Sequence, residues 1–370
     1  MQRKTNTEPL PHDVIEHILE KLDVKTVLKF KLVSKQWNST IQSRWFQERQ
    51  LIHRKQSGNP DVLLVSILTN SISLEAMRTL VLGSSVSLKI PTPWENIYYN
   101  VGNYSCDGLV CLYDALVSNP NIVVNPSTRW HRAFPYSTYQ LLKMRGKLKE
   151  SAHLGFGKDK INGTYKPVWL YNSDELCLNN KNNNAPTVCE VFDFTSNAWR
   201  YVVPASPYPI YSWQDPVYLD GSLHWFTKDE TMVLTLDLQS ETFQVMSKTP
   251  FVRRKDSRRK VGMCNLADRL CVFEEKWANQ MIWSFDSDQK IWKKIYSIDR
   301  LMTSPINTSL SLKPLAVVDN GKLLVCEAAG IGVELLIYDP QTKSYDLAYT
   351  CNDYMTASHL CYFQSLISIF

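Results

Sequence analysis

Residues 10–38, LPHDVIEHILEKLDVKTVLKFKLVSKQWN, have the pattern of a helical domain at the start of the chain. The first half of this stretch places apolar residues at offsets of one, three and four, which is the spacing of a single stripe along a helix. Asp23 and Ser34 can cap two further short helices, which carry Leu28 and Trp37 respectively. Three helices in about forty residues cannot bury their apolar faces on one another alone, so we expect something else to cover them.

The same residues resemble an F-box. The match begins at Leu10 and Pro11 and runs through all three helices to Trp37, and it departs from the usual pattern at Asp23 (commonly proline) and Ser34 (commonly cysteine). The resemblance implies that this segment binds the acidic SKP adaptor of cullin-RING ubiquitin ligases. The residues that would then face the adaptor are Leu10, Pro11, Val14, Ile15, Ile18, Val27, Leu28, Val33, Lys35 and Trp37. The alternative is that these apolar residues form the core of an ordinary helical subdomain.

The positive charge of the chain is concentrated at its start. Residues 1–57 carry 11 Lys and Arg against 6 Asp and Glu, an excess that equals the +5 of the whole chain. An excess of this size suits an acidic protein partner better than duplex nucleic acid, whose binders carry a dense basic stripe.

After a loop signal at residues 56–60 the helical period is lost, and one motif repeats. The motif is an apolar strand that runs into Asp or Asn, then a turn, then an aromatic residue about six positions on. Its five copies recur with a period near 50 residues once insertions are allowed for, and they begin at Asn125, Asp193, Asp237, Asp286 and Asp339.

Several copies follow an Asp-Gly or Asn-Gly pair, at 107–108, 220–221 and 320–321, and these pairs suit tight hairpin turns. Each unit therefore holds about four strands, and four-stranded units of this length are typical of a β-propeller. We expect the aromatic residues at 130, 199, 243, 292 and 345 to pack between blades. A row of rings that binds a ligand is the alternative.

Segments spread over nearly the whole chain, such as 107–112, 125–128 and 221–225, resemble the kelch-like F-box-associated domain of plant F-box proteins. The expected class is α+β and multidomain: a disordered N-terminus at 1–9, a small three-helix F-box at 10–50, a linker at 51–60, and an all-β, kelch-type propeller of about six blades at 61–370. We expect the ring to close between an early strand, at 62–67 or near Leu80, and the C-terminal segment 366–370.

The cysteines and the N-terminus indicate the compartment. None of the nine cysteines are spaced as Cys-x-x-Cys, and Cys111, Cys271 and Cys326 stand in apolar runs as small buried thiols. We therefore expect a reducing compartment. The N-terminus lacks a signal-type apolar stretch, and no run of about 18 apolar residues occurs. The prediction is a protein of the cytosol or nucleus that neither spans nor binds a membrane.

Sequence motifs of enzymes are mostly absent. There is no phosphate loop, nucleophile elbow, His-Glu-x-x-His motif or calcium loop. His224 lies on an expected strand between Leu223 and Trp225 and is interpreted as a structural histidine. We therefore expect no catalytic residue, no metal site and no cofactor.

One segment is densely basic. Six bases fall within eight residues: Arg253, Arg254, Lys255, Arg258, Arg259 and Lys260. The segment is a solvated loop, a nuclear-import signal, or a patch that docks an acidic degron or a phosphorylated substrate. If a second basic stretch, 143–149, lies on the same propeller face, we expect the substrate to be acidic.

Together these features favour a non-catalytic substrate-recognition subunit of an SCF-type (SKP-cullin-F-box) E3 ubiquitin ligase, with the SKP adaptor on the F-box and a target protein on the propeller. No nucleic-acid partner is expected. One alternative is a propeller that reads a glycan or small molecule outside any ligase. A second is a propeller enzyme of the galactose-oxidase type, which would need clustered metal ligands at the propeller centre.

Overall fold

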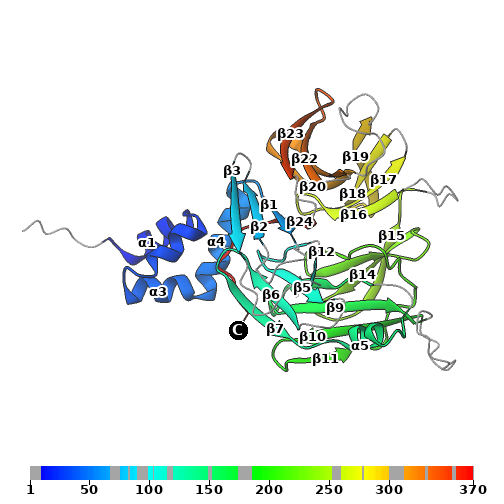
Figure 1. Cartoon of the computed structure of the whole chain (residues 1–370), viewed down its shortest axis with the longest axis horizontal. Helices are drawn as coiled ribbons and strands as arrows, with labels where there is room; N and C mark the ends of the chain where they lie inside the picture. The colour runs from blue at the N-terminus through cyan, green and yellow to red at the C-terminus, as the bar shows by residue number, and fades with distance from the viewer. Residues whose placement is uncertain are drawn as a thin grey trace, which may run out of the picture.

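The computed structural model describes residues 10–66, 76–81, 84–89, 99–102, 104–114, 120–148, 152–173, 186–251, 260–276, 279–299, 312–329, 332–351 and 356–369. Four helices come first along the chain: α1 (His12–Glu20), α2 (Val24–Phe30), α3 (Lys35–Gln42) and α4 (Arg44–Ser57). They lie at one end of the molecule, with α4 nearest the β-sheets (Figure 1).

The predicted helix caps are confirmed, and one helix was not predicted. Asp23 accepts a hydrogen bond from the backbone N–H of Thr26, and Ser34 accepts one from that of Trp37. Residues 51–57, predicted as part of a linker, instead continue α4, because Leu51 is buried in its apolar face and the breaking signal begins only at Gly58. The expected three-helix domain therefore has a fourth helix that leads into the first sheet.

Six four-stranded antiparallel sheets follow, and we call each a blade. Blade 1 contains β1 (Asp61–Ser66), β2 (Ala76–Val81), β3 (Ser84–Lys89) and β24 (Thr356–Tyr362), and blade 2 contains β4 (Tyr99–Val101), β5 (Val110–Asp114), β6 (Asn121–Asn125) and β7 (Trp130–Phe134). Blade 3 contains β8 (Gly155–Lys158), β9 (Tyr165–Asn172), β10 (Thr187–Asp193) and β11 (Ala198–Tyr201), and blade 4 contains β12 (Val217–Leu219), β13 (Ser222–Phe226), β14 (Met232–Asp237) and β15 (Phe243–Lys248). Blade 5 contains β16 (Lys260–Asn265), β17 (Leu270–Lys276), β18 (Asn279–Asp286) and β19 (Ile291–Asp299), and blade 6 contains β20 (Leu312–Val318), β21 (Lys322–Ala329), β22 (Gly332–Asp339) and β23 (Ser344–Cys351). Helix α5 (Thr138–Met144) joins blades 2 and 3.

Six apolar clusters hold the blades together, one between each pair of neighbours around the ring. Strand β1 shows how, because Val62 and Leu64 pack towards blade 6 while the alternate residues Leu63 and Val65 pack towards blade 2. A strand buried on both faces has no polar side to present, which explains the near-continuous apolar runs in the sequence. The closed ring confirms the predicted propeller of about six blades.

The ring closes by pairing the first and last strands. β24 pairs antiparallel with β1, and Leu63 lies opposite Leu360. The prediction of β1 as one partner is right, but the prediction of residues 366–370 as the other is wrong, because β24 ends at Tyr362. Residues 363–369 leave the sheet instead.

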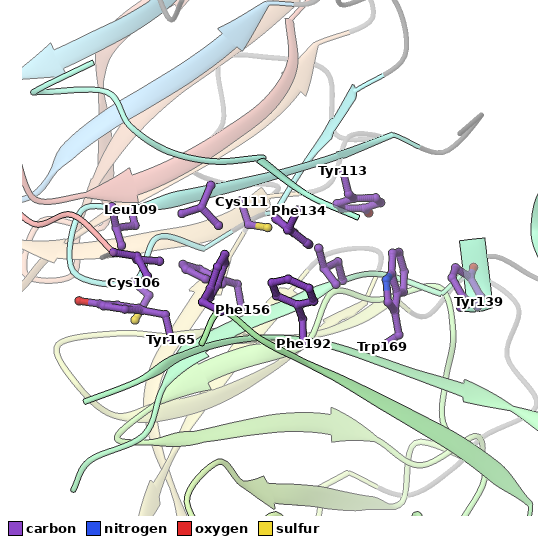
Figure 2. Packing of buried hydrophobic residues seen from close by; sticks show 14 of the residues in the cluster. Cys106, Leu109, Cys111, Tyr113, Phe134, Tyr139, Phe156, Tyr165, Trp169 and Phe192 are labelled. Carbon is purple, nitrogen blue, oxygen red and sulfur yellow. The ribbon is translucent and has the colours of Figure 1, made fainter. Parts of the chain in front are cut away.

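The repeated aromatic residues pack as predicted. Trp130 and Trp199 lie against the cluster between blades 2 and 3, and Phe243, Trp292 and Tyr345 lie against the clusters that their own blades share with the preceding blade. Figure 2 shows the centre of the first cluster, where Tyr139 stacks on Trp169 with ring centroids 4.3 Å apart. The five repeated aromatic residues are only partly buried, because they lie on the outer strands of their blades.

The repeated Asp or Asn closes the outer hairpin of its blade. In all five copies its side-chain oxygen accepts a hydrogen bond from the backbone N–H two residues on. Four residues after it, in every copy, stands a residue with a positive φ angle: Arg129, Asn197, Glu241, Lys290 and Lys343. None is glycine, so each copy carries the strain of a left-handed backbone.

We predict that Lys290→Gly stabilises the protein. The left-handed conformation of a non-glycine residue costs about 1–2 kcal/mol, and glycine loses about 0.5–1 kcal/mol of backbone entropy, so the net gain is about 0.5–1 kcal/mol. Urea denaturation measures it. The control is Lys294→Gly in β19, four residues on, which should lower stability because that backbone is extended. A loss for both variants would contradict the strain at Lys290.

Candidate adaptor surface and substrate face

One face of α1 exposes large apolar side chains. Val14 and Ile18 are one helical turn apart, and Leu10 lies two residues before the start of α1; the three are 39%, 47% and 60% exposed respectively. The opposite face turns Leu19 into the core of the helical domain. An apolar stripe left open to solvent on so small a domain marks a contact surface for another protein.

A second apolar patch follows α2. Val33 is 58% exposed, as predicted, and Leu32 is 90% exposed. Helix α2 ends at Phe30, so Leu32 lies in the turn that follows it. Of the remaining predicted adaptor residues, Pro11 and Lys35 are also exposed.

Four of the ten predicted adaptor residues are wholly or partly buried against the core of the helical domain. Val27 has no exposed surface and belongs to the core of the helical domain, so its assignment to the adaptor surface is wrong: its side chain faces Leu19 and Ile41 across the domain. Ile15, Leu28 and Trp37 are half-buried against the same core. Trp37 packs edge-on against Phe30, with ring centroids 5.5 Å apart.

Lysines lie beside the exposed apolar residues. Lys25, Lys29 and Lys35 are exposed, and Lys31 is half-buried, where burial lowers the pKa of its ammonium group. No carboxylate within ion-pair distance of these four lysines appears among the described residues. The surface is therefore apolar with a positive margin, which suits an acidic partner.

Helix α4 is fixed to the propeller through Asp107, in the turn between β4 and β5. Its carboxylate lies 3.1 Å from Nζ of Lys55 on α4 and 3.2 Å from Nζ of Lys158 at the end of β8. The hydroxyl of Tyr165 donates a hydrogen bond to it at 3.0 Å. Burial alone would raise the pKa of Asp107, but the two lysine charges outweigh burial and hold it below the usual value. The sequence indicated only a hairpin turn here, because Lys55 and Lys158 are distant along the chain.

The C-terminal segment 363–369 is a second connection between the helical domain and the blades. Leu366 is 4% exposed and packs into the core of the helical domain. Asn125 donates hydrogen bonds from its side-chain amide to the backbone oxygens of Ser365 and Ile367. Ser365 in turn donates to the backbone oxygen of Asp107 at 2.7 Å. The helical domain therefore includes a residue from the far end of the chain.

A pocket of about 370 Å³ opens on the other face of the propeller. Strand β20 runs from the pocket towards the helical domain. Lys313, near the start of this strand, lines the pocket. After the end of the strand, Asp319 accepts a hydrogen bond from Asn59, just beyond α4. A strand of this length spans about 20 Å. The pocket therefore faces away from the helical domain.

The predicted basic substrate patch falls mostly outside the described residues. Arg253, Arg254, Lys255, Arg258 and Arg259 lie there, and so does Lys149 of the second basic stretch. Lys260 is described, is exposed and lines the pocket. Lys143 and Arg145, in and just after α5, are also at the surface.

The described residues hold little that resembles a catalytic centre. They contain no group of three or more His, Cys, Asp or Glu side chains placed to hold a metal ion. His224 is 4% exposed and bonds through Nδ1 to the backbone oxygen of Val217, which confirms its structural role. Cys111, Cys271 and Cys326 are buried free thiols, as predicted. Among the described helices, none is long and apolar enough to cross a membrane.

Comparison with known proteins places the chain in a family. Two family models match it, an F-box domain over residues 9–49 and an F-box associated beta propeller domain over residues 64–369. The chain therefore belongs to the F-box proteins that carry an F-box associated β-propeller, and the predicted family is confirmed.

Similar proteins come from Arabidopsis thaliana. F-box protein At2g34280 is 58% identical, over 97% of this chain and 99% of its own length, and F-box protein At5g10340 is 58% identical over 98% and 85%. F-box/LRR-repeat/kelch-repeat protein At1g09650 is 49% identical over 100% of this chain and 99% of its own.

We predict that Asp107→Asn loosens the joint between α4 and the propeller. Asn fits the same left-handed turn but removes the charge that pairs with two lysines, so the loss should be about 1–3 kcal/mol. Hydrogen exchange should accelerate in α4 and at Ser365 and not in blade 5. The control is Asp220→Asn, at the equivalent turn of blade 4, where the carboxylate is 66% exposed. Equal effects of the two changes would contradict the role of Asp107.

Proposed function

We propose that the protein is a substrate receptor of an SCF-type ubiquitin ligase, with the F-box bound to a SKP-family adaptor and the propeller bound to a target protein. Membership of the F-box family and the exposed stripe of Leu10, Val14 and Ile18 support the first half of this proposal. The exposed stripe is the main observation in favour of adaptor binding, because an uncovered apolar face with a positive margin is complementary to an acidic partner with an apolar groove.

The arrangement of the two parts supports the second half. The pocket faces away from the helical domain, so an adaptor on α1 and a target at the pocket would not compete for the same surface. A receptor of this kind contributes proximity: it converts the encounter between a target lysine and the ubiquitin thioester into an effectively intramolecular step. No residue of this chain needs to touch the reacting bond, so the proposed role is non-catalytic.

We predict that Val14→Asp and Ile18→Asp each weaken adaptor binding at least about tenfold. Burial of one such side chain contributes about 1.5–3 kcal/mol, and a carboxylate would in addition repel an acidic partner. Both side chains point to solvent, so the variants should keep their circular dichroism spectra. Isothermal titration with the purified SKP adaptor measures the affinity.

The matched control is Ile52→Asp, which adds the same charge to an exposed position on α4, away from the stripe. It should bind the adaptor as the wild type does. If the wild type binds no SKP adaptor of its host, the ligase proposal fails, and the chain becomes a propeller binding module outside a ligase.

A further inference from the structure

The pocket on the far face of the propeller lies between the starts of three inner strands, β12, β16 and β20, and we call it the axial pocket. Aromatic side chains form much of its wall: Tyr104, Tyr211, Trp213 and Phe273. Trp213 is 64% exposed, although rings of this size are seldom left in water without a contact to make. A volume of about 370 Å³ admits a few side chains of a peptide and excludes a folded domain.

In the axial pocket the acidic residues have interaction partners, whereas the two lysines form no ion pair with a described residue. The carboxylate of Asp215 lies 3.0 Å from Nδ1 of His153, and Glu230 also has an interaction of its own. Lys260 and Lys313 have no carboxylate within ion-pair distance among the described residues. The Lys313 ammonium lies over the Tyr104 ring, 6.0 Å from the ring centroid. The positive charge is therefore the one left available to a ligand.

His153 supports this assignment of charge. Burial alone would lower its pKa, but the hydrogen bond and negative charge of Asp215 outweigh burial and raise it. A histidine held closer to its charged form neutralises Asp215 further, so that carboxylate repels an incoming anion less.

We propose that the axial pocket binds an acidic peptide segment of the target protein. A carboxylate of the segment would lie between Lys313 and Lys260, and a neighbouring apolar side chain would pack on Trp213. Two lysine point charges attract a carboxylate, and the exposed indole supplies contact area at little cost in side-chain entropy. The assignment of the occupant as a target rests on the proposed function, whereas the binding itself can be measured on this chain alone.

The test is selection of a random ten-residue peptide display library on the purified full-length protein. Selected peptides should be enriched in Asp and Glu next to Phe, Tyr, Trp or Leu. A synthetic peptide of the selected sequence should lose at least about tenfold in affinity for Lys313→Gln and for Trp213→Ala, measured by fluorescence anisotropy. Lys294→Gln, the same change at an exposed lysine of β19, should bind as the wild type does.

Several results would overturn the proposal. These are a selected set without acidic residues, no selection at all, or equal affinity of the wild type and Lys313→Gln. Binding only when the acidic residues are replaced by phosphoserine would also contradict it, as would equally strong competition by a 20-nucleotide single-stranded DNA. Adaptor binding, measured on the same preparations, is independent: its loss alone overturns the ligase function and leaves the axial pocket standing.

Discussion

Strand β24 pairs with β1, and this pairing fixes where the chain enters and leaves the propeller. It places the first and last strands of the propeller in one blade, so the chain enters the ring from α4 and leaves it through residues 363–369 at the same place. Both connections therefore reach the helical domain. Had the ring closed elsewhere, Leu366 would lie too far away to complete the core of the F-box. A short helical domain thereby gains the apolar contact that its own size denies it.

The joint adds charge to this apolar contact. Asp107 forms ion pairs with Lys55 of α4 and Lys158 of β8. Nζ of Lys158 also lies 3.4 Å from Oε1 of Glu48 in α4. Salt screens partly buried ion pairs less than exposed ones. Together with the C-terminal segment, these pairs connect α4 to blades 2 and 3 at several points. The stripe on α1 and the axial pocket are thereby held on opposite sides of one body. For a protein that acts by proximity, this fixed separation is the useful property.

Local rules predicted much of the structure and failed where distant residues meet. The caps at Asp23 and Ser34 and the five Asp or Asn turns depend only on neighbours within four residues, so the sequence pattern was sufficient. The burial of Val27 depends on residues of two other helices, Leu19 of α1 and Ile41 of α3, and periodicity alone does not separate a domain's inner face from a partner's surface. The closing strand was misplaced because residues 366–370 are more apolar than residues 356–362, and only pairing with β1 identifies the true partner. The axial pocket brings together residues from Tyr104 to Lys313, which no local motif could reveal.

The exposed stripe of Leu10, Val14 and Ile18 and the axial pocket are held in one relative orientation. Double electron–electron resonance tests it most directly, with spin labels carried by non-natural residues at two exposed lysines, Lys21 after α1 and Lys228 at the pocket face. We expect a single narrow distance distribution that does not change when the SKP adaptor binds. A broad or multimodal distribution in the free protein would contradict it, because the helical domain would then move independently of the propeller.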